Sequence, residues 1–356
     1  MAYSVEPLSP FGALVHGIDL QWAPDVAARE MLQYDAARYG FLVFPNQTLP
    51  GDSLAMAASV AFGSGCLAER HTVHSAAVHD GILRLSNEES HGITFVGPQW
   101  HSDGAFERRP FSHVLFHPQQ MPADGGGGTE LTDLSAAYEA LPTRLKHEWS
   151  RLAIANAYSG ALHPLVGTHP VSGKRVLFAH LGMVGAVLRW PEWPKCAVRS
   201  WTAVALEAMD ASTGPRAECG HELLPEEEVR QLMRAIDGVL TRHGIVWNYR
   251  LTRREAGVAA DLLVVDNLAV AHRAAPSAHA AGTGELRILH RTTVAGTHAL
   301  DPPAASRLPP FLYMWGERPM LQLDHGGKGV GVNGLWMGSD HLGVGFRWNV
   351  SLPMRN

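Results

Sequence analysis

Two short runs, far apart in the sequence, carry the ligand types of a single metal site. The first is Trp100-His101-Ser102-Asp103, and the second places His272 shortly after Asp266-Asn267. Two imidazoles and one carboxylate are the protein ligands that hold non-haem Fe(II) on one face and leave other positions open. A fold that uses all three side chains must bring these two distant runs together.

The His-x-Asp spacing has a geometric rationale. Successive side chains of an extended segment point to opposite faces, so His101 and Asp103 share one face while Ser102 points away. The chain has 20 histidines and 34 acidic residues among 356. Chance alone then gives roughly two His-x-Asp/Glu matches, and the chain holds one. A strand-end His and Asp bonded to backbone or water is the alternative, so the surrounding sequence has to decide.

Composition narrows the class of protein. The net charge of −5 argues against a nucleic-acid surface, and no apolar run is long enough to span a membrane. The first residues lack the charged and apolar regions of a secretory signal. The three cysteines are odd in number and widely spaced, which is typical of a reducing compartment and speaks against a disulfide or zinc framework. We therefore expect a cytoplasmic protein that contacts neither nucleic acid nor membrane.

Periodicity predicts many short strands and few helices. One helix is expected at Val26–Tyr39, between the N-cap Asp25 and Gly40, and others at residues 52–62, 135–141 and 225–242. Strand-like runs occupy residues 41–44, 82–85, 112–116, 245–249, 262–265 and 286–294. This pattern favours a mainly β fold with flanking helices, built as a double-sheet barrel or jelly roll. A dinucleotide-binding fold is disfavoured because no strand is followed by Gly-x-Gly-x-x-Gly.

The last strand-like run carries a second signal. Strand alternation places Arg287, Leu289 and Arg291 on one face, and Ile288 and Val294 on the other. Guanidinium groups bind carboxylates well in partly buried sites. The flanking residues are apolar on both faces, which indicates a buried strand, although two surface arginines paired with acidic neighbours are the alternative.

The order of these motifs resembles that of the taurine/2-oxoglutarate dioxygenase (TauD/TfdA) family of Fe(II) oxygenases. The resemblance runs from Val5 to about Thr297 and implies a double-stranded β-helix, the cupin-like jelly roll, as the core. Residues 1–297 would form the dioxygenase domain, and residues 298–356 would form a C-terminal extension packed on it. The matching runs are Val5–Ala13, Gly17–Leu20, Phe41–Phe44 with Asn46-Gln47, Trp100–Asp103 with Phe106, Gly127–Thr129, Asp133-Leu134, Ala137–Leu141, His163–Val166, Thr168–Pro170, Gly173, Asp266-Asn267, His272, Arg287 and Arg291.

The resemblance implies roles for five residues around the cofactors, which are Fe(II), the cosubstrate 2-oxoglutarate and O2. His101, Asp103 and His272 match the iron ligands. Arg287 matches the arginine that pairs with the distal carboxylate of 2-oxoglutarate, and Thr129 matches the threonine that assists it. The implied reaction couples oxidative decarboxylation of 2-oxoglutarate to hydroxylation of an unactivated C–H bond.

At the positions that contact the substrate in the family, the sequence matches the family less completely. Arg291 matches the arginine that binds the acidic group of the substrate, and Phe106 is expected to line the substrate pocket. The family's substrate-contacting histidine falls near His71, with His74 as a weaker candidate, and either could be a solvated loop histidine. Gly97 stands near the family's substrate-contacting asparagine, and this departure puts a taurine substrate in doubt.

The expected substrate is a small anionic or zwitterionic molecule. An amino acid or derivative is the first choice, either free or tethered to a carrier protein, in secondary metabolism; a homo-oligomer is also open. The same chemistry giving desaturation or ring formation is an alternative, and so is a non-catalytic jelly-roll module that binds a ligand at a vestigial site. The insert around residues 188–219 and the C-terminal extension could cover the mouth of the site, where loops usually set specificity, or be surface elaboration.

Overall fold

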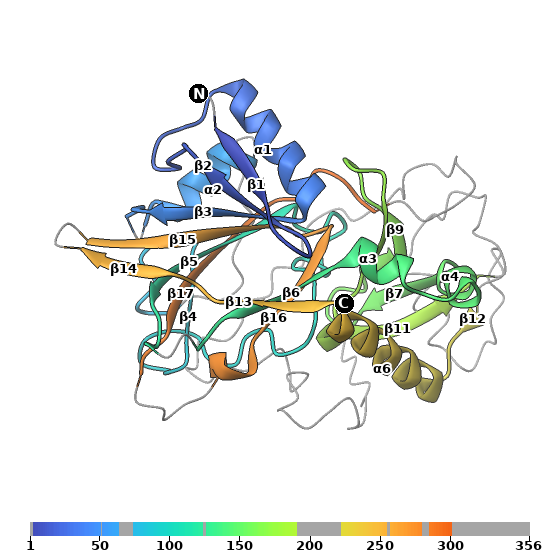
Figure 1. The fold of residues 1–356 in the computed structure, drawn as a ribbon. Helices are drawn as coiled ribbons and strands as arrows, with labels where there is room; N and C mark the ends of the chain where they lie inside the picture. The colour runs from blue at the N-terminus through green and yellow to red at the C-terminus, as the bar shows by residue number, and fades with distance from the viewer. Residues whose placement is uncertain are drawn as a thin grey trace, which may run out of the picture.

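The computed structural model describes residues 3–50, 52–63, 74–123, 126–190, 222–254, 257–279 and 285–300. Its largest element is an eight-stranded sheet (Figure 1). Seven of its strands follow the order β1 (Ser4–Pro7), β2 (Ala13–His16), β3 (Phe41–Gln47), β15 (Gly257–Asp266), β5 (His113–Gln120), β17 (Ile288–Val294) and β4 (Leu83–Ser86). The eighth, β14 (Leu251–Arg254), pairs with β15.

A three-stranded sheet packs against the inner face of the large one. Its strand order is β13 (Gly244–Trp247), β6 (Thr129–Asp133) and β16 (Val270–Ala274), all antiparallel. Leu131 and Val270 of this small sheet share one apolar cluster with Val114, Phe116 and other residues of the large sheet. Two facing sheets around a common core make a jelly roll, so the expected mainly β fold is confirmed.

The central strands of the large sheet are buried on both faces. Along β3, Phe41 and Val43 join the cluster between the two sheets, whereas Leu42 and Phe44 join a second cluster on the outer face. Two helices, α1 (Val26–Tyr39) and α2 (Leu54–Phe62), cover that outer face (Figure 1). This two-sided burial explains why the sequence of these strands is a continuous apolar run without polar alternation.

The remaining elements form a second layer beside the jelly roll (Figure 1), around an apolar cluster of their own. They comprise a four-stranded sheet of β12 (Glu222–Leu223), β11 (Val184–Arg189), β7 (Leu152–Asn156) and β8 (Leu162–Pro164), the pair β10 (Arg175–Leu177) and β9 (Val166–Thr168), the helices α3 (Leu134–Glu139), α4 (Thr143–Trp149) and α6 (Glu226–Arg242), and the short 3-10 turn η1 (Leu181–Met183). A further 3-10 turn, η2 (Pro276–His279), follows β16.

The helix predictions are confirmed, with small shifts at the ends. Asp25 accepts a hydrogen bond from the Ala28 amide at 2.8 Å, and Gly40 ends α1 at a φ of 86°. In α6, the apolar residues at helical spacing are all buried; they are Val229, Leu232, Met233, Ile236 and Leu240. The second helix begins at Leu54 rather than at residue 52, because the Ser53 amide closes a turn onto the Pro50 carbonyl before the helix starts.

Several expectations fall on residues outside the described ranges. These are all three cysteines, His71, most of the insert at residues 188–219 and all but the first residues of the C-terminal extension. The division into residues 1–297 and 298–356 stays a prediction.

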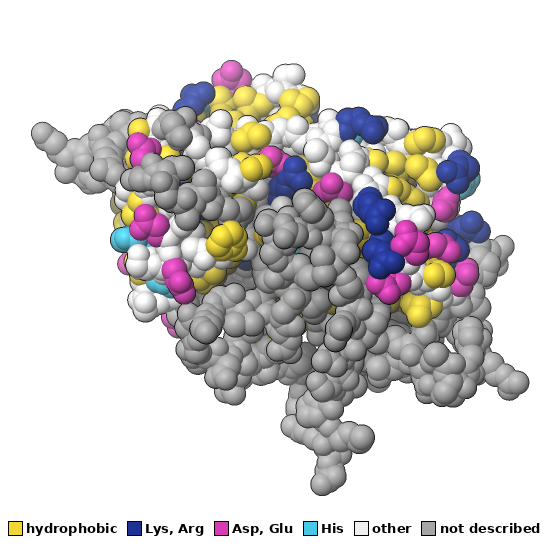
Figure 2. Space-filling view, turned by 90° about the horizontal axis from the view of Figure 1, so that it is seen from below, with side chains coloured by type: hydrophobic (Ala, Val, Ile, Leu, Met, Phe, Trp, Pro, Cys, Tyr) yellow, Lys and Arg dark blue, Asp and Glu magenta, His cyan; other side chains and the backbone are white. Residues whose placement is uncertain are grey.

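Within the described residues, no helix is both long enough and apolar enough to cross a membrane. Acidic and basic side chains of the described residues are mixed on the face seen in Figure 2. On α6, for example, Arg230 pairs with Glu226 at 2.6 Å and with Glu227 at 2.7 Å.

Two buried histidines make the stability of the fold sensitive to acid. Burial lowers the pKa of His117 and of His163 to about 4, whereas an unfolded histidine has a pKa of about 6.5. Between these values the unfolded chain binds a proton and the folded chain does not. We expect the free energy of unfolding to fall by about 1.4 kcal/mol per pH unit and per histidine as the pH drops from about 6.5 to about 4.

Urea unfolding at pH 7, 6 and 5 measures this slope. His163→Gln should reduce the slope, because one of the groups that take up a proton on unfolding is gone. An unfolding free energy that stays constant over this range would contradict the prediction.

Candidate active site

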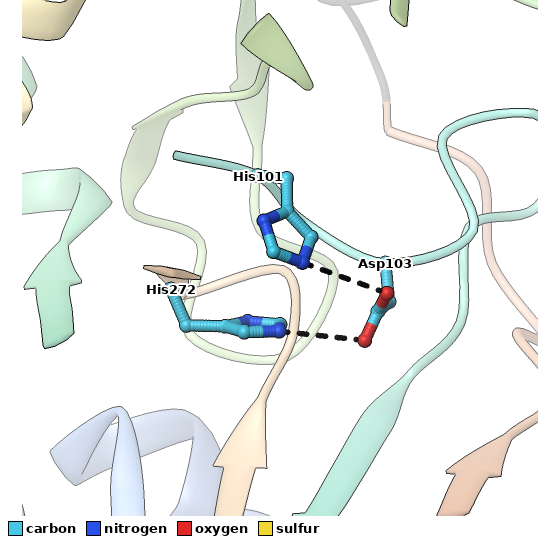
Figure 3. A group of neighbouring side chains, drawn as sticks. All are labelled: His101, Asp103 and His272. Atoms are coloured by element: carbon cyan, nitrogen blue, oxygen red, sulfur yellow. Dashed lines mark ion pairs between the residues drawn. The ribbon is translucent and has the colours of Figure 1, made fainter. Parts of the chain in front are cut away.

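The two histidines lie on neighbouring backbone segments, one ahead of β5 and the other within β16. His101 and His272 form an antiparallel bridge, in which each amide donates to the other's carbonyl, at 3.0 and 2.9 Å. Asp103 turns its carboxylate toward both imidazoles (Figure 3), 3.8 Å from Nε2 of His101 and 3.4 Å from Nε2 of His272. One ligand atom from each of the three residues lies within 4.8 Å of the others. The structure thus brings together the three side chains singled out in the sequence.

The charge state of this group suits a cation. Burial alone would raise the pKa of Asp103, but Arg291, His272 and His101 outweigh it and hold that pKa well below its usual range. Burial, and then the neighbouring His272 and His180, lowers the pKa of His101 well below its ordinary value. The centre of the His180 ring lies 4.9 Å from that of the His101 ring, and burial lowers the pKa of His180 to about 4. At neutral pH the site therefore presents a carboxylate at Asp103 and a neutral imidazole at His101, the forms of these groups that bind metal ions.

At the centre of the group formed by His101, Asp103 and His272, buried atoms without hydrogen-bond partners in the described part of the chain are suited to bind a metal ion. Oδ2 of Asp103 and Nε2 of His272 are buried and have no hydrogen-bond partner among the described residues. Nδ1 of His101 lies 2.8 Å from the carbonyl of Gln99. If it donates there, as ligand histidines usually do, Nε2 is left with a lone pair facing the group. Buried polar atoms without partners are costly, and a cation bound by all three side chains would satisfy them.

Asn267 fixes the backbone of the candidate ligand Asp103. This fully buried side chain accepts from the Asp103 amide at 2.7 Å and donates to the Asp103 carbonyl at 2.7 Å. It also donates to the carbonyl of Phe111 at 2.7 Å. A single side chain thus joins the turn before β16 to both sides of Asp103.

We expect Asn267→Ala to lower the free energy of unfolding by roughly 2–4 kcal/mol, because three buried hydrogen bonds are lost and their backbone partners stay buried. Urea unfolding checks this value. Asn267→Asp should not restore stability, since a carboxylate cannot donate to the two carbonyls. A stable Asp variant would show that these donor bonds contribute little.

Trp100 and Arg273, the residues next to His101 and His272 in the sequence, anchor the two histidines. The Arg273 guanidinium lies 4.5 Å from the centre of the Trp100 ring. Trp100 donates through Nε1 to the hydroxyl of Thr241 in α6, at 3.0 Å. Arg273 also pairs with Glu130 of β6. These contacts tie the bridge between His101 and His272 to both the small sheet and α6.

The metal-binding group opens into a cavity that is partly open to solvent. His101 and His272 line it, together with three other residues that the sequence singled out: Thr129, Arg287 and Arg291. Arg287 and Arg291 face the same space, as strand alternation predicted. Arg287 lies just before β17, because its amide donates to Asn87 at 2.8 Å.

Two features that the sequence did not reveal shape the part of the cavity around Arg287. The hydroxyl of Tyr249 lies 2.7 Å from that of Thr129, and both side chains are buried. Nε of Arg287 donates to the Gly127 carbonyl at 2.8 Å. A methyl group on Gly127, which has a φ of 81°, would lie 2.8 Å from Cδ of Arg287, so the glycine lets the loop approach the arginine closely.

The departure at Gly97 has a steric cause. This residue lines the cavity with a φ of 67°, and a Cβ here would lie 2.7 Å from Cε1 of His101. Any larger residue would push against the imidazole. With this backbone the chain cannot carry an asparagine side chain at position 97. The closeness of Gly97 to His101 depends on the fold and is not visible in the sequence.

Two other candidates, both among the described residues, do not line the cavity. Phe106 packs edge-on against Phe111 and Tyr158, with ring centres 5.7 and 6.2 Å apart, and is not among the described residues that line the space. His74 lies 2.8 Å from the Glu89 carbonyl through Nε2 and is also absent from the lining. A substrate contact for Phe106 stays a prediction, as does one for His71, which lies outside the described residues.

The fold and the site define a jelly-roll protein with a two-histidine, one-carboxylate group beside a cavity that holds two arginines. Comparison with known families gives a more specific assignment. The sequence profile of the "Taurine catabolism dioxygenase TauD, TfdA family" matches residues 4–293, so the chain belongs to this family of Fe(II)- and 2-oxoglutarate-dependent dioxygenases.

Individual relatives agree with this assignment. The chain is 28% identical over 197 residues to a Schizosaccharomyces pombe protein named as an alpha-ketoglutarate-dependent sulfonate dioxygenase, a match that covers 48% of this chain and 49% of the relative. It is 29% identical to the (S)-phenoxypropionate/alpha-ketoglutarate-dioxygenase of Sphingobium herbicidovorans, over 49% of this chain and 70% of the relative. The match thus spans about half the length of the first relative.

The fold is also found among solved structures. A taurine dioxygenase from Burkholderia xenovorans superposes with a TM-score of 0.60 and 21% identity, over 85% of this chain and 94% of the other. This likeness supports the jelly-roll fold.

Proposed function

We propose that this protein is an Fe(II)- and 2-oxoglutarate-dependent dioxygenase that hydroxylates an unactivated C–H bond of a small organic anion. One observation carries the proposal. His101 and His272 line the same cavity as Thr129, Arg287 and Arg291, so groups able to hold a metal, a dicarboxylate and a second anion face one space.

Each group has a part in this proposal. His101, Asp103 and His272 would hold Fe(II) from one side and leave positions open on the other. Arg287, with Thr129 and its partner Tyr249, would bind the distal carboxylate of 2-oxoglutarate. When bound, Fe(II) would activate O2, and the oxidative decarboxylation of 2-oxoglutarate to succinate and CO2 would supply two of the electrons that O2 takes up. The chain itself positions the reactants and excludes water.

Arg291 would hold the acidic group of the substrate. Nη1 of this arginine donates to Oδ1 of Asp103 at 3.1 Å, which aims the guanidinium at the candidate metal group. Its buried Nε has no hydrogen-bond partner among the described residues. Donors near the metal suit a carboxylate or sulfonate, and the names of the relatives include both a sulfonate and a phenoxypropionate.

The range of substrates to be tested also depends on Arg291, which would bind any small molecule with an acidic group. We include an amino acid or derivative, free or tethered to a carrier protein in secondary metabolism, among the anions to be tested. Desaturation or ring formation would use the same residues, and the mass of the product separates these reactions from hydroxylation.

Succinate release tests the proposed activity. The purified full chain is given Fe(II), 2-oxoglutarate and air, with a panel of sulfonates, aryloxyalkanoates and amino acids. We expect at least one acid to stimulate succinate formation, and we expect Asp103→Ala to abolish it. Failure of the protein to bind Fe(II) and 2-oxoglutarate without oxygen would overturn the proposal and favour a non-catalytic module.

A further inference from the structure

A strained aromatic residue stands at the opening of the cavity. Phe95 has a φ of 55°, a left-handed conformation that is rare for bulky side chains. Its side chain is 64% exposed, yet it lines the cavity. Neither an exposed aromatic ring nor a left-handed backbone is favourable in itself, so the surrounding structure has to impose both.

Hydrogen bonds on either side of Phe95 impose this conformation. On one side, Ile93 is held to the edge strand β4: its amide donates to the Arg84 carbonyl at 2.9 Å, and its carbonyl accepts from the Ser86 amide at 3.0 Å. On the other side, the Gly97 carbonyl accepts at 2.8 Å from the amide of Ala274, the last residue of β16, which is the strand that carries His272. The loop is thus fixed to both sheets, and Phe95 lies between the two attachment points.

The lining of the cavity combines two kinds of side chain. Its arginines are Arg287, just before β17, and Arg291 within that strand. Much of the remaining lining is apolar and comprises Leu85, Ile93, Phe95, Val96, Phe116 and Leu289. A fully polar substrate would leave this apolar surface exposed to water, whereas an apolar substrate body would cover both this surface and the exposed Phe95 ring.

We propose that Phe95, with Ile93 and Val96, forms a wall that binds the non-polar body of the substrate, so that the substrate is an amphipathic acid with one acidic group and an apolar or aromatic body. This inference rests on the proposed function and narrows its substrate class. Phe95 is a specificity residue in this scheme, because it contacts the substrate body while Arg291 binds the acid.

A matched pair of probe acids tests the wall. Phenoxyacetate and methoxyacetate share a carboxylate and an ether oxygen and differ only in phenyl against methyl. Their dissociation constants are measured by calorimetry on the full chain loaded with Fe(II) and 2-oxoglutarate without oxygen. We expect the unmodified protein to bind phenoxyacetate at least about tenfold more tightly than methoxyacetate.

The informative variant is Phe95→Asn, because asparagine tolerates the left-handed backbone but offers no aromatic surface. We expect it to weaken phenoxyacetate binding about three- to tenfold and to leave the dissociation constants of methoxyacetate and 2-oxoglutarate unchanged. The unfolding temperature should stay the same or rise, because strain is relieved. Val171→Asn, the same kind of exchange at a residue that is 54% exposed and does not line the cavity, is the control and should change neither constant.

Each of these measurements has an outcome that would contradict the proposed apolar wall. Equal affinity for the two probes in the unmodified protein, or binding of neither, overturns the apolar wall. A Phe95→Asn variant with a higher unfolding temperature but unchanged phenoxyacetate affinity would show that the strain at Phe95 has no role in substrate binding. Both results are distinct from failure of the proposed function, in which Fe(II) and 2-oxoglutarate themselves do not bind.

Discussion

His272→Ala is expected to abolish iron binding and leave the fold intact. Removing one of three ligands should weaken Fe(II) binding by more than about 100-fold, since even the loss of an outer-shell partner commonly costs 10–100-fold. The fold should tolerate the change, because neither ring nitrogen of His272 has a hydrogen-bond partner among the described residues. The backbone bonds between His101 and His272 do not need the imidazole.

Metal content after anaerobic loading, together with the circular dichroism spectrum and the unfolding midpoint, checks both halves of this expectation. His16→Ala is the matched control, since His16 lies on the exposed end of β2 and contacts Glu6 at 3.4 Å. It should bind iron as the unmodified chain does. Full iron loading of the His272 variant would mean that another residue supplies the third ligand.

Arg287→Ala is expected to raise the dissociation constant for 2-oxoglutarate about 10- to 100-fold. The reason is the loss of charge-assisted hydrogen bonds in a buried setting, which are worth about 1.5–3 kcal/mol. Arg287 is only 5% exposed, so water cannot replace the guanidinium effectively. Iron binding should not change, because Arg287 is not among the three metal-binding side chains.

Calorimetric titration of 2-oxoglutarate without oxygen measures this effect. Arg144→Ala serves as the control, because its side chain is 81% exposed on α4. A dissociation constant that is the same in both variants would remove Arg287 from the cosubstrate site and leave Arg291 as the alternative partner.

The sequence predicts those parts of the fold that have local signals. Asp25 and Gly40 mark both ends of α1, and the apolar face of α6 has clear helical spacing. Alternation along the last strand places Arg287 and Arg291 in one cavity. By contrast, β8, β9 and β10 have three residues each. Such short strands show no period and exist only through their pairing, so the sequence did not reveal them.

The parts of the site that escaped prediction depend on contacts between distant segments. Tyr249 reaches Thr129 because β13 and β6 pair with Trp247 opposite Thr129, a register that no local pattern encodes. Asn267 was seen as part of a motif, but its bonds to Asp103 required the fold. The left-handed backbone of Phe95 is likewise invisible in the sequence, since phenylalanine does not favour it.

The bridge between His101 and His272 has a consequence for how the protein folds. It joins residues 101 and 272, which are 171 positions apart in the sequence, and such non-local contacts form late because a long loop must close first. A cation that needs both histidines recognises only the closed chain and therefore acts as a reporter of completed folding. At a free concentration 100 times its dissociation constant, it would add about 2.7 kcal/mol to the apparent stability by mass action.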